Sequence, residues 1–139
     1  MKQVTTTLHI ETNGPGLTEF TGEVASWAAA QGMDEGLLTL FLRHTSASLL
    51  IQENADPDVQ RDLQTFFEKL APWDASLYRH TTEGEDDMPA HIRAALTQTS
   101  LSIPVVDARL ALGTWQGIYL FEHRVHRQAR NVVLHLMGN

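Results

Sequence analysis

Residues 78–91, YRHTTEGEDDMPAH, combine two histidines and a run of acids in one short segment. Between His80 and His91 lie four acids: Glu83, Glu85, Asp86 and Asp87. Imidazoles with carboxylates suit Zn, Mn or Fe, whereas carboxylates with water suit Mg, often through a substrate diphosphate. The chain has no cysteine, so a metal would need His, Asp, Glu or backbone oxygen as ligands. The spacing of the two histidines is no recognised zinc signature, so the segment permits a metal site without requiring one.

The same segment has simpler interpretations. Asp87 precedes a helix predicted to begin at Pro89, where an aspartate can cap free N–H groups and face the positive end of the helix dipole. The acids can also form a solvated surface, with both histidines bonded to backbone. A helix N-terminus is in addition a natural anion site, where phosphate and metal could meet. These alternatives stay open on sequence alone.

A second candidate is HTSASLLIQEN, residues 44–54. His44 falls where one predicted strand ends, and Glu53 and Asn54 close the next strand. If the two strands pair tightly, His44 and Glu53 lie at different distances from the turn and need not be neighbours. A histidine at a strand end is either a ligand or catalyst, or a cap of the Thr45-Ser46 turn.

A third candidate is EHRVHRQAR, residues 122–130, in a chain that has only two lysines. Arg124, Arg127 and Arg130 fall within this stretch, and Arg109 lies upstream. Arginine offers a bidentate fork to phosphate or carboxylate. Anion binding and ion pairing across a subunit interface are both consistent with this pattern, and both hold if the site lies between subunits.

The fourth candidate is LGTWQG, residues 112–117, in which two glycines flank an indole and an amide. Trp115 can stack on a flat ring, and Gln116 can read the edge of that ring. Such a tryptophan more often packs in a core or an interface.

The elements expected to position these residues alternate between strands and helices. Three helices are predicted: 18–31; one capped by Asp56, with Pro57 at its first position, that ends at Pro72; and one that opens at Pro89. A turn is predicted at 13–16, and the strands are predicted at 3–10, 36–45, 46–54, 100–106, 114–123 and 129–137. The strands are too many for one parallel sheet with crossovers, so we expect an α+β fold with mostly antiparallel pairing.

The composition limits the partners. The chain has 139 residues, 42% of them hydrophobic and 19% charged, which suits one globular domain spanning 1–139. A net charge of -7 argues against nucleic acid and against an anionic membrane surface as partners. There is no apolar run long enough for a transmembrane helix and no signal-peptide pattern. A cytoplasmic location is the default expectation.

Three motifs together resemble the YjbQ family, which carries the label secondary thiamine-phosphate synthase. They are HTSASLLIQENADPDV, YRHTTEGEDDMPAHIRAAL and LGTWQGIYLFEHR, in this order. The resemblance runs from about residue 4 to the C-terminus. One departure is Asp107-Ala108-Arg109, because the family commonly has a glycine before the arginine. The departure raises a question about the conformation of this loop.

The resemblance implies two small sheets packed as a sandwich with flanking helices, and a homotrimer with the sheets gathered around the threefold axis. It also implies a weak thiamine-phosphate synthase activity, which joins an aminopyrimidine-methyl diphosphate to a thiazole phosphate and releases diphosphate. The word "secondary" in the family label means that this reaction need not be the principal role.

From these observations we expect a phosphate-handling enzyme with a divalent metal, Mg or Zn. The expected metal ligands are His44, His80, His91 and Asp86. The expected catalytic residues are His44, Glu53, Asp87, His91 and Arg124, with Arg124 on a phosphate. Trp115 and Gln116 are expected to hold a heterocycle. The competing expectations are a non-catalytic trimeric module that binds a metal or a phosphorylated metabolite, and a metal-dependent phosphoester hydrolase.

Overall fold

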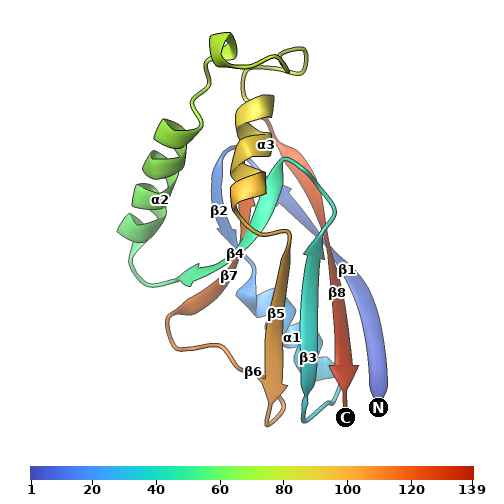
Figure 1. The fold of residues 1–139 in the computed structure, drawn as a ribbon. Helices are drawn as coiled ribbons and strands as arrows, with labels where there is room; N and C mark the ends of the chain where they lie inside the picture. Colours follow the sequence, from blue (N-terminus) through green and yellow to red (C-terminus); the bar gives the residue numbers. More distant parts are fainter.

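A computed structural model describes all residues 1–139 and shows two antiparallel sheets with three α-helices (Figure 1). The larger sheet has the order β1-β8-β3-β5-β6 and the smaller one β2-β7-β4. The strands are β1 (Lys2–Thr12), β2 (Gly16–Glu19), β3 (Gly36–Leu42), β4 (Ala47–Glu53), β5 (Ser100–Val106), β6 (Arg109–Leu110), β7 (Gln116–Glu122) and β8 (Gln128–Gly138). The helices are α1 (Thr21–Ala30), α2 (Pro57–Leu70) and α3 (Asp87–Leu96), with a 3-10 turn, η1, at Ala75–Leu77.

The core lies between the two sheets and α1. On β8 the buried hydrophobic side chains are Val132, Leu134 and Leu136, which alternate with less buried neighbours as expected of a strand with one covered face. They share one hydrophobic cluster with Leu49 of β4 and Val24 of α1. Both sheets therefore bury their inner faces against a common core. The predicted α+β fold with antiparallel sheets is confirmed.

Three short connections pass between the sheets at one end of the molecule. They are residues 13–15, 43–46 and 123–127, which join β1 to β2, β3 to β4 and β7 to β8. The register brings them together, because Gly16 and Ala47 both pair with Glu122. The sequence left open whether the strands predicted at 36–45 and 46–54 pair with each other. In the structure they lie in different sheets. His44 therefore sits where the chain crosses from one sheet to the other.

Helix α2 has the predicted cap and buries little of its apolar surface. Asp56 caps it through a hydrogen bond from the backbone N–H of Asp58 (2.9 Å), as predicted. Phe67 is its only buried residue, and the apolar side chains of Phe66 and Leu70 are exposed. No helix of the structure has the length and apolar character needed to cross a membrane.

The loop that departs from the family pattern adopts a left-handed backbone without glycine. Asp107 has φ 49° and Ala108 has φ 62°. Residues with a Cβ rarely adopt this conformation, because Cβ approaches the following carbonyl oxygen. The backbone N–H of Ala108 donates to the carbonyl oxygen of Asp34 (2.9 Å), which helps to hold the turn in place.

Candidate metal centre

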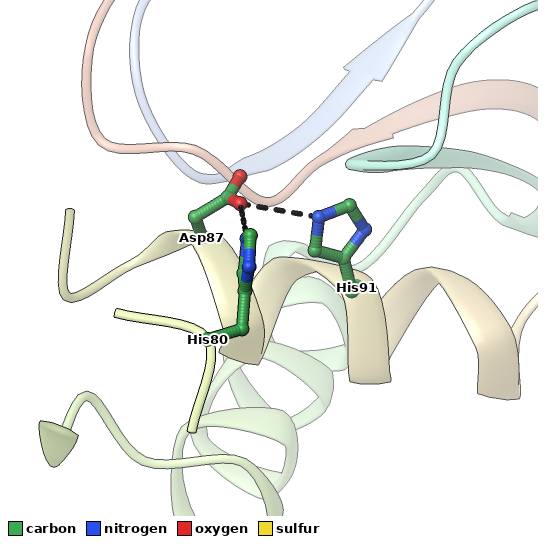
Figure 2. A group of neighbouring side chains, drawn as sticks. All are labelled: His80, Asp87 and His91. Carbon is green, nitrogen blue, oxygen red and sulfur yellow. Dashed lines mark hydrogen bonds and ion pairs between the residues drawn. The ribbon is translucent and has the colours of Figure 1, made fainter. Parts of the chain in front are cut away.

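His80, Asp87 and His91 form a compact cluster at the start of α3 (Figure 2). Their ligand atoms all lie within 4.8 Å of one another. Oδ2 of Asp87 is 2.6 Å from Nε2 of His80 and 3.1 Å from Nε2 of His91. The Asp87 side chain is 3% exposed, whereas those of His80 and His91 are 40% and 34% exposed. A buried carboxylate thus faces two imidazoles that solvent can reach.

The ring of His91 has a hydrogen-bond acceptor at both nitrogens. Nδ1 lies 3.0 Å from the carbonyl oxygen of Thr45, and Nε2 faces the Asp87 carboxylate. A neutral imidazole carries one N–H, so it can satisfy only one of these acceptors. Both contacts are satisfied if the ring is protonated twice, or if Nε2 and the carboxylate share a metal ion. An imidazole that donates its second N–H to a backbone carbonyl is the usual arrangement of a metal-bound histidine.

Arg124 holds the two aspartates in place. Its Nε donates to Oδ2 of Asp86 (2.9 Å), its Nη1 to Oδ1 of Asp87 (2.6 Å) and its Nη2 to the carbonyl oxygen of Glu83 (3.0 Å). The hydrogen bond to Asp86 is the main reason that the pKa of Arg124 lies above its ordinary value. Each guanidinium nitrogen has a partner within the chain. Within one chain, the charge of Arg124 is paired with the two aspartates, and its binding of a phosphate stays a prediction.

The aspartates do not act as helix caps. Asp86 is the residue before α3, but its side chain makes no capping hydrogen bond, and the helix begins at Asp87 rather than at Pro89. Oδ2 of Asp86 instead accepts from Arg124 and from the backbone N–H of Val125 (2.9 Å). Asp86 was expected as a metal ligand, and the structure leaves it outside the cluster. The simple helix-cap interpretation is also wrong.

The pKa of Asp87 reflects its partners. Burial alone would raise the pKa of this carboxyl, but the hydrogen bond from His80 and the charges of Arg124 and His91 lower it below the ordinary range. Asp87 is therefore ionised at neutral pH. Two carboxylates, Asp86 and Asp87, face one guanidinium, and the excess negative charge favours a cation beside the histidines.

His44 lies next to this cluster but not in it. Its Nε2 accepts a hydrogen bond from the backbone N–H of Asn131 (2.9 Å), so this nitrogen is not free for a metal. Burial, followed by the charge of Arg130, lowers the pKa of His44, which keeps the ring neutral. His44 and His91 line the same cavity, which has a volume of about 280 Å³. His44 was expected as a metal ligand, but its Nε2 faces the β8 backbone, so only Nδ1 is left for such a role.

A second charged cluster behind His44 was not anticipated from sequence. The carboxylate of Glu122 accepts from Arg130 Nε (2.8 Å) and from the Thr12 hydroxyl (2.6 Å), and both members of the ion pair are buried. Arg130 Nη2 also donates to the hydroxyl and the carbonyl oxygen of Ser46. Arg130 lies two residues before the buried Val132 on β8, so both side chains point to the same, inward face of the strand. This spacing is a signal in the sequence that could have revealed the buried arginine. The pair fixes the 43–46 connection that carries His44 and the Thr45 carbonyl.

The remaining arginines differ in whether they have a partner within the chain. Arg127 pairs with Glu11 at the surface (2.7 Å), and Arg109 belongs to the exposed edge strand β6. Arg130 forms a buried ion pair with Glu122. Within one chain, Arg124, Arg127 and Arg130 therefore form ion pairs with acids, whereas anion binding and pairing across a subunit interface stay predictions for this stretch.

Glu53, Trp115 and Gln116 lie at the opposite end of the smaller sheet. Glu53 is the last residue of β4 and pairs in register with Gln116, whereas the cluster end of the same strands is marked by the Ala47 and Glu122 pair. Six residue steps along a strand span about 20 Å. Within one chain, the structure does not bring these three residues to the histidines. Trp115 is exposed there, so it does not pack in the core of the chain.

Comparison with known proteins agrees with this fold. The family model described as UPF0047 protein YjbQ-like matches residues 6–139. The chain is 55% identical over 131 residues to UPF0047 protein sll1880 of Synechocystis, covering 94% of this chain and 89% of that protein. It is 50% identical to UPF0047 protein YjbQ of Escherichia coli O157:H7 over 103 residues, which are 74% of each chain.

Solved structures give the same picture. The crystal structure of a Clostridium acetobutylicum protein of the yjbq/upf0047 family superposes with a TM-score of 0.84 at 34% identity, covering 96% of this chain and 99% of that one. A Sulfolobus solfataricus protein described as of unknown function gives a TM-score of 0.86 at 21% identity and shows the shared fold. The match to the family model over nearly the whole chain, together with these relatives, shows that the protein belongs to the YjbQ-like UPF0047 family.

Proposed function

We propose that this protein is a phosphate-handling enzyme that binds one divalent metal ion through His80, Asp87 and His91. The observation that carries the proposal is the shared Asp87 oxygen, which faces two imidazoles, one of which already donates to the Thr45 carbonyl. Two nitrogens and one carboxylate oxygen suit Zn, Mn or Fe, and three protein ligands leave coordination positions for substrate.

The neighbouring cavity supports a place for the phosphate. Because Nε2 of His44 accepts a hydrogen bond, the neutral ring carries its proton on Nδ1. That Nδ1–H has no partner in the chain and is not sealed from solvent. Thr45 and Thr99 also line the cavity, and no acidic residue does. A phosphate oxygen there would accept from His44 while the same phosphate reaches the ion beside His91.

The reaction that we propose is the one implied by the family resemblance. In it, the bond from the pyrimidine methylene carbon to the diphosphate oxygen breaks, and a bond to the thiazole nitrogen forms. Negative charge grows on the departing diphosphate, and a bound divalent ion would neutralise part of it. The role of His44 in this reaction is to donate a hydrogen bond to a phosphate oxygen. His80 and Asp87 orient the metal, and Arg124 orients Asp87.

The first test is the metal content of the purified protein. Wild type is expected to carry about one Zn, Mn or Fe per chain, and Asp87→Asn to lose at least a hundredfold in metal affinity, because a ligand and its charge are removed. His135→Ala is the matched control, since its ring bonds only to Gln3 on the larger sheet. A wild-type protein that binds no divalent ion at micromolar concentrations would refute the metal site.

The second test separates the three proposed activities. Diphosphate release that requires the thiazole phosphate and is reduced in His44→Ala supports the transferase. Consumption of a generic phosphoester without an acceptor would indicate the hydrolase instead. Protection from heat by a phosphorylated ligand with no turnover would indicate a binding module.

We extend the proposal to the assembly and propose a homotrimer. The outer face of the larger sheet exposes Leu37 and Phe41 of β3, Val106 of β5 and Met137 of β8. An apolar group of this kind on one sheet face is typical of a surface that associates with another chain. Sedimentation equilibrium tests this, and a purely monomeric protein at micromolar concentration would contradict it.

A further inference from the structure

Arg93 is a buried arginine that the candidate metal centre does not use. It lies on α3 two residues after His91, which places it about 200° around the helix, on the other side from the cluster. Its side chain is 1% exposed. Nη2 donates to the carbonyl oxygen of Ala71 (3.0 Å), but Nε and Nη1 have no hydrogen-bond partner. The guanidinium thus carries a full positive charge but makes only one hydrogen bond, to a backbone carbonyl.

Such an arrangement is unfavourable unless something completes it. A buried charge is normally paired, and unpaired N–H groups away from water lose the hydrogen bonds that water supplied. Burial lowers the pKa of Arg93, and the charge of Glu68 offsets this only in part. The Glu68 carboxylate accepts a hydrogen bond from the amide of Gln64 (3.4 Å) and forms no ion pair with Arg93.

A cavity of about 340 Å³ adjoins this arginine. Its walls are Glu68, Pro72, Trp73 and Arg93, which come from α2, the segment after it and α3. The volume is at the lower end of the range for small-molecule pockets. The indole of Trp73 and the ring of Pro72 supply apolar surface, and Arg93 supplies the positive charge.

We propose that this cavity binds a small organic anion, with a carboxylate or phosphate on Arg93 and a flat apolar body against Trp73. The positive charge of the guanidinium would hold the anion at the cavity wall. Nε and Nη1 are closed to solvent, so direct hydrogen bonds from them to the anion require the surrounding side chains to move. The site is separate from the metal centre and from the His44 cavity, which open on the other side of α3. Glu68 at the rim would discourage ligands that carry several negative charges.

The test compares benzoate with benzamide as probes, by thermal denaturation at constant ionic strength. Benzoate is expected to raise the melting temperature of the wild-type protein in a saturable manner, and benzamide, which lacks the charge, is not. In Arg93→Met the affinity for benzoate should fall about ten- to a hundredfold, as expected for a lost charge-assisted contact. Arg61→Met is the control, because Arg61 is exposed and pairs with Asp58 on the surface of α2.

The stability of the ligand-free protein gives an independent readout. Arg93→Met should melt at the same or a higher temperature than wild type, because an unpaired buried charge is replaced by an apolar side chain of similar length. Glu68→Gln should bind benzoate more tightly. If Arg93→Met instead melts lower and Glu68→Gln destabilises the protein without improving binding, Glu68 is the partner of Arg93 and the proposal is wrong.

Two further outcomes are decisive. Benzoate stabilisation that persists in Asp87→Asn and with EDTA supports a site independent of the metal centre. The absence of any benzoate effect on wild type, with Arg93→Met dissociating the assembled protein, would show that a carboxylate of a second copy occupies the cavity. That result would overturn the small-molecule site.

Discussion

Two clusters of carboxylates and arginines lie at the same end of the molecule and differ in what completes them. In the Glu122–Arg130 cluster, both side chains are buried, and the carboxylate accepts from Arg130, Thr12 and the backbone N–H groups of His123 and Arg124. In the Asp87–Arg124 cluster, the buried carboxylate turns one oxygen toward two partly exposed histidines. The first is closed by protein groups and is a structural brace. The second is left open toward solvent, where an ion can bind.

The largest effect is expected from breaking the closed cluster. Arg130→Gln leaves the Glu122 carboxylate buried without its cation, which should reduce the free energy of unfolding by about 3–5 kcal/mol. Urea denaturation measures this. The double variant Glu122→Leu with Arg130→Met should recover much of the loss. If Arg130→Gln costs less than about 1 kcal/mol, the pair is not a brace.

The second-largest effect is expected from lowering the pH, which should reduce stability through His123 beside the closed cluster. Burial, with the charge of Arg93, lowers the pKa of His123 to about 3. In the unfolded chain His123 titrates near pH 6.5, so below that pH the unfolded chain binds a proton at this residue that the folded protein does not bind. Stability is therefore present above about pH 6.5 and should fall by roughly 3 kcal/mol between pH 7 and pH 4. His123→Gln, compared by the same denaturation series, should show a much flatter profile in this window.

A smaller effect is expected in the open cluster. Arg124→Gln removes the group that orients Asp87, and should weaken metal binding about tenfold while changing the unfolding free energy of the metal-free protein less than Arg130→Gln does. Competition with a chromophoric chelator measures the affinity. Arg127→Gln, which breaks only the surface pair with Glu11, is the control. Equal metal affinity in Arg124→Gln and wild type would show that Arg124 does not position the ligand.

The smallest effect concerns a loop far from both clusters. Ala108 holds a left-handed φ of 62°, which glycine adopts without steric cost. Ala108→Gly should therefore stabilise the protein by about 0.5–1 kcal/mol, less whatever backbone entropy the glycine adds to the unfolded chain. Metal affinity should stay unchanged. A destabilised variant would show that the surrounding contacts relieve the strain at this turn.

Much of the fold followed from local pattern. The strand predicted at 100–106 is β5, and the helix capped by Asp56 with Pro57 at its first position is α2. The short strands β2 and β6 were missed, because strands of four and two residues are too short to show an alternating hydrophobic pattern. Periodicity shows which face of α2 is apolar but not whether a neighbour lies against it, and in one chain Phe66 and Leu70 are exposed.

The sequence by itself determined the types of element, the antiparallel α+β class and the presence of histidines and acids in one loop. Only the tertiary structure decided which of them meet. His44 and Glu53 are close in sequence, but a strand holds them at its two ends, whereas Thr45 and His91 are brought together by the packing of α3 on β4. Local pattern fixes spacing along the chain, and chemistry depends on distances across it. These distances are set by sheet register and by which buried charges find a partner.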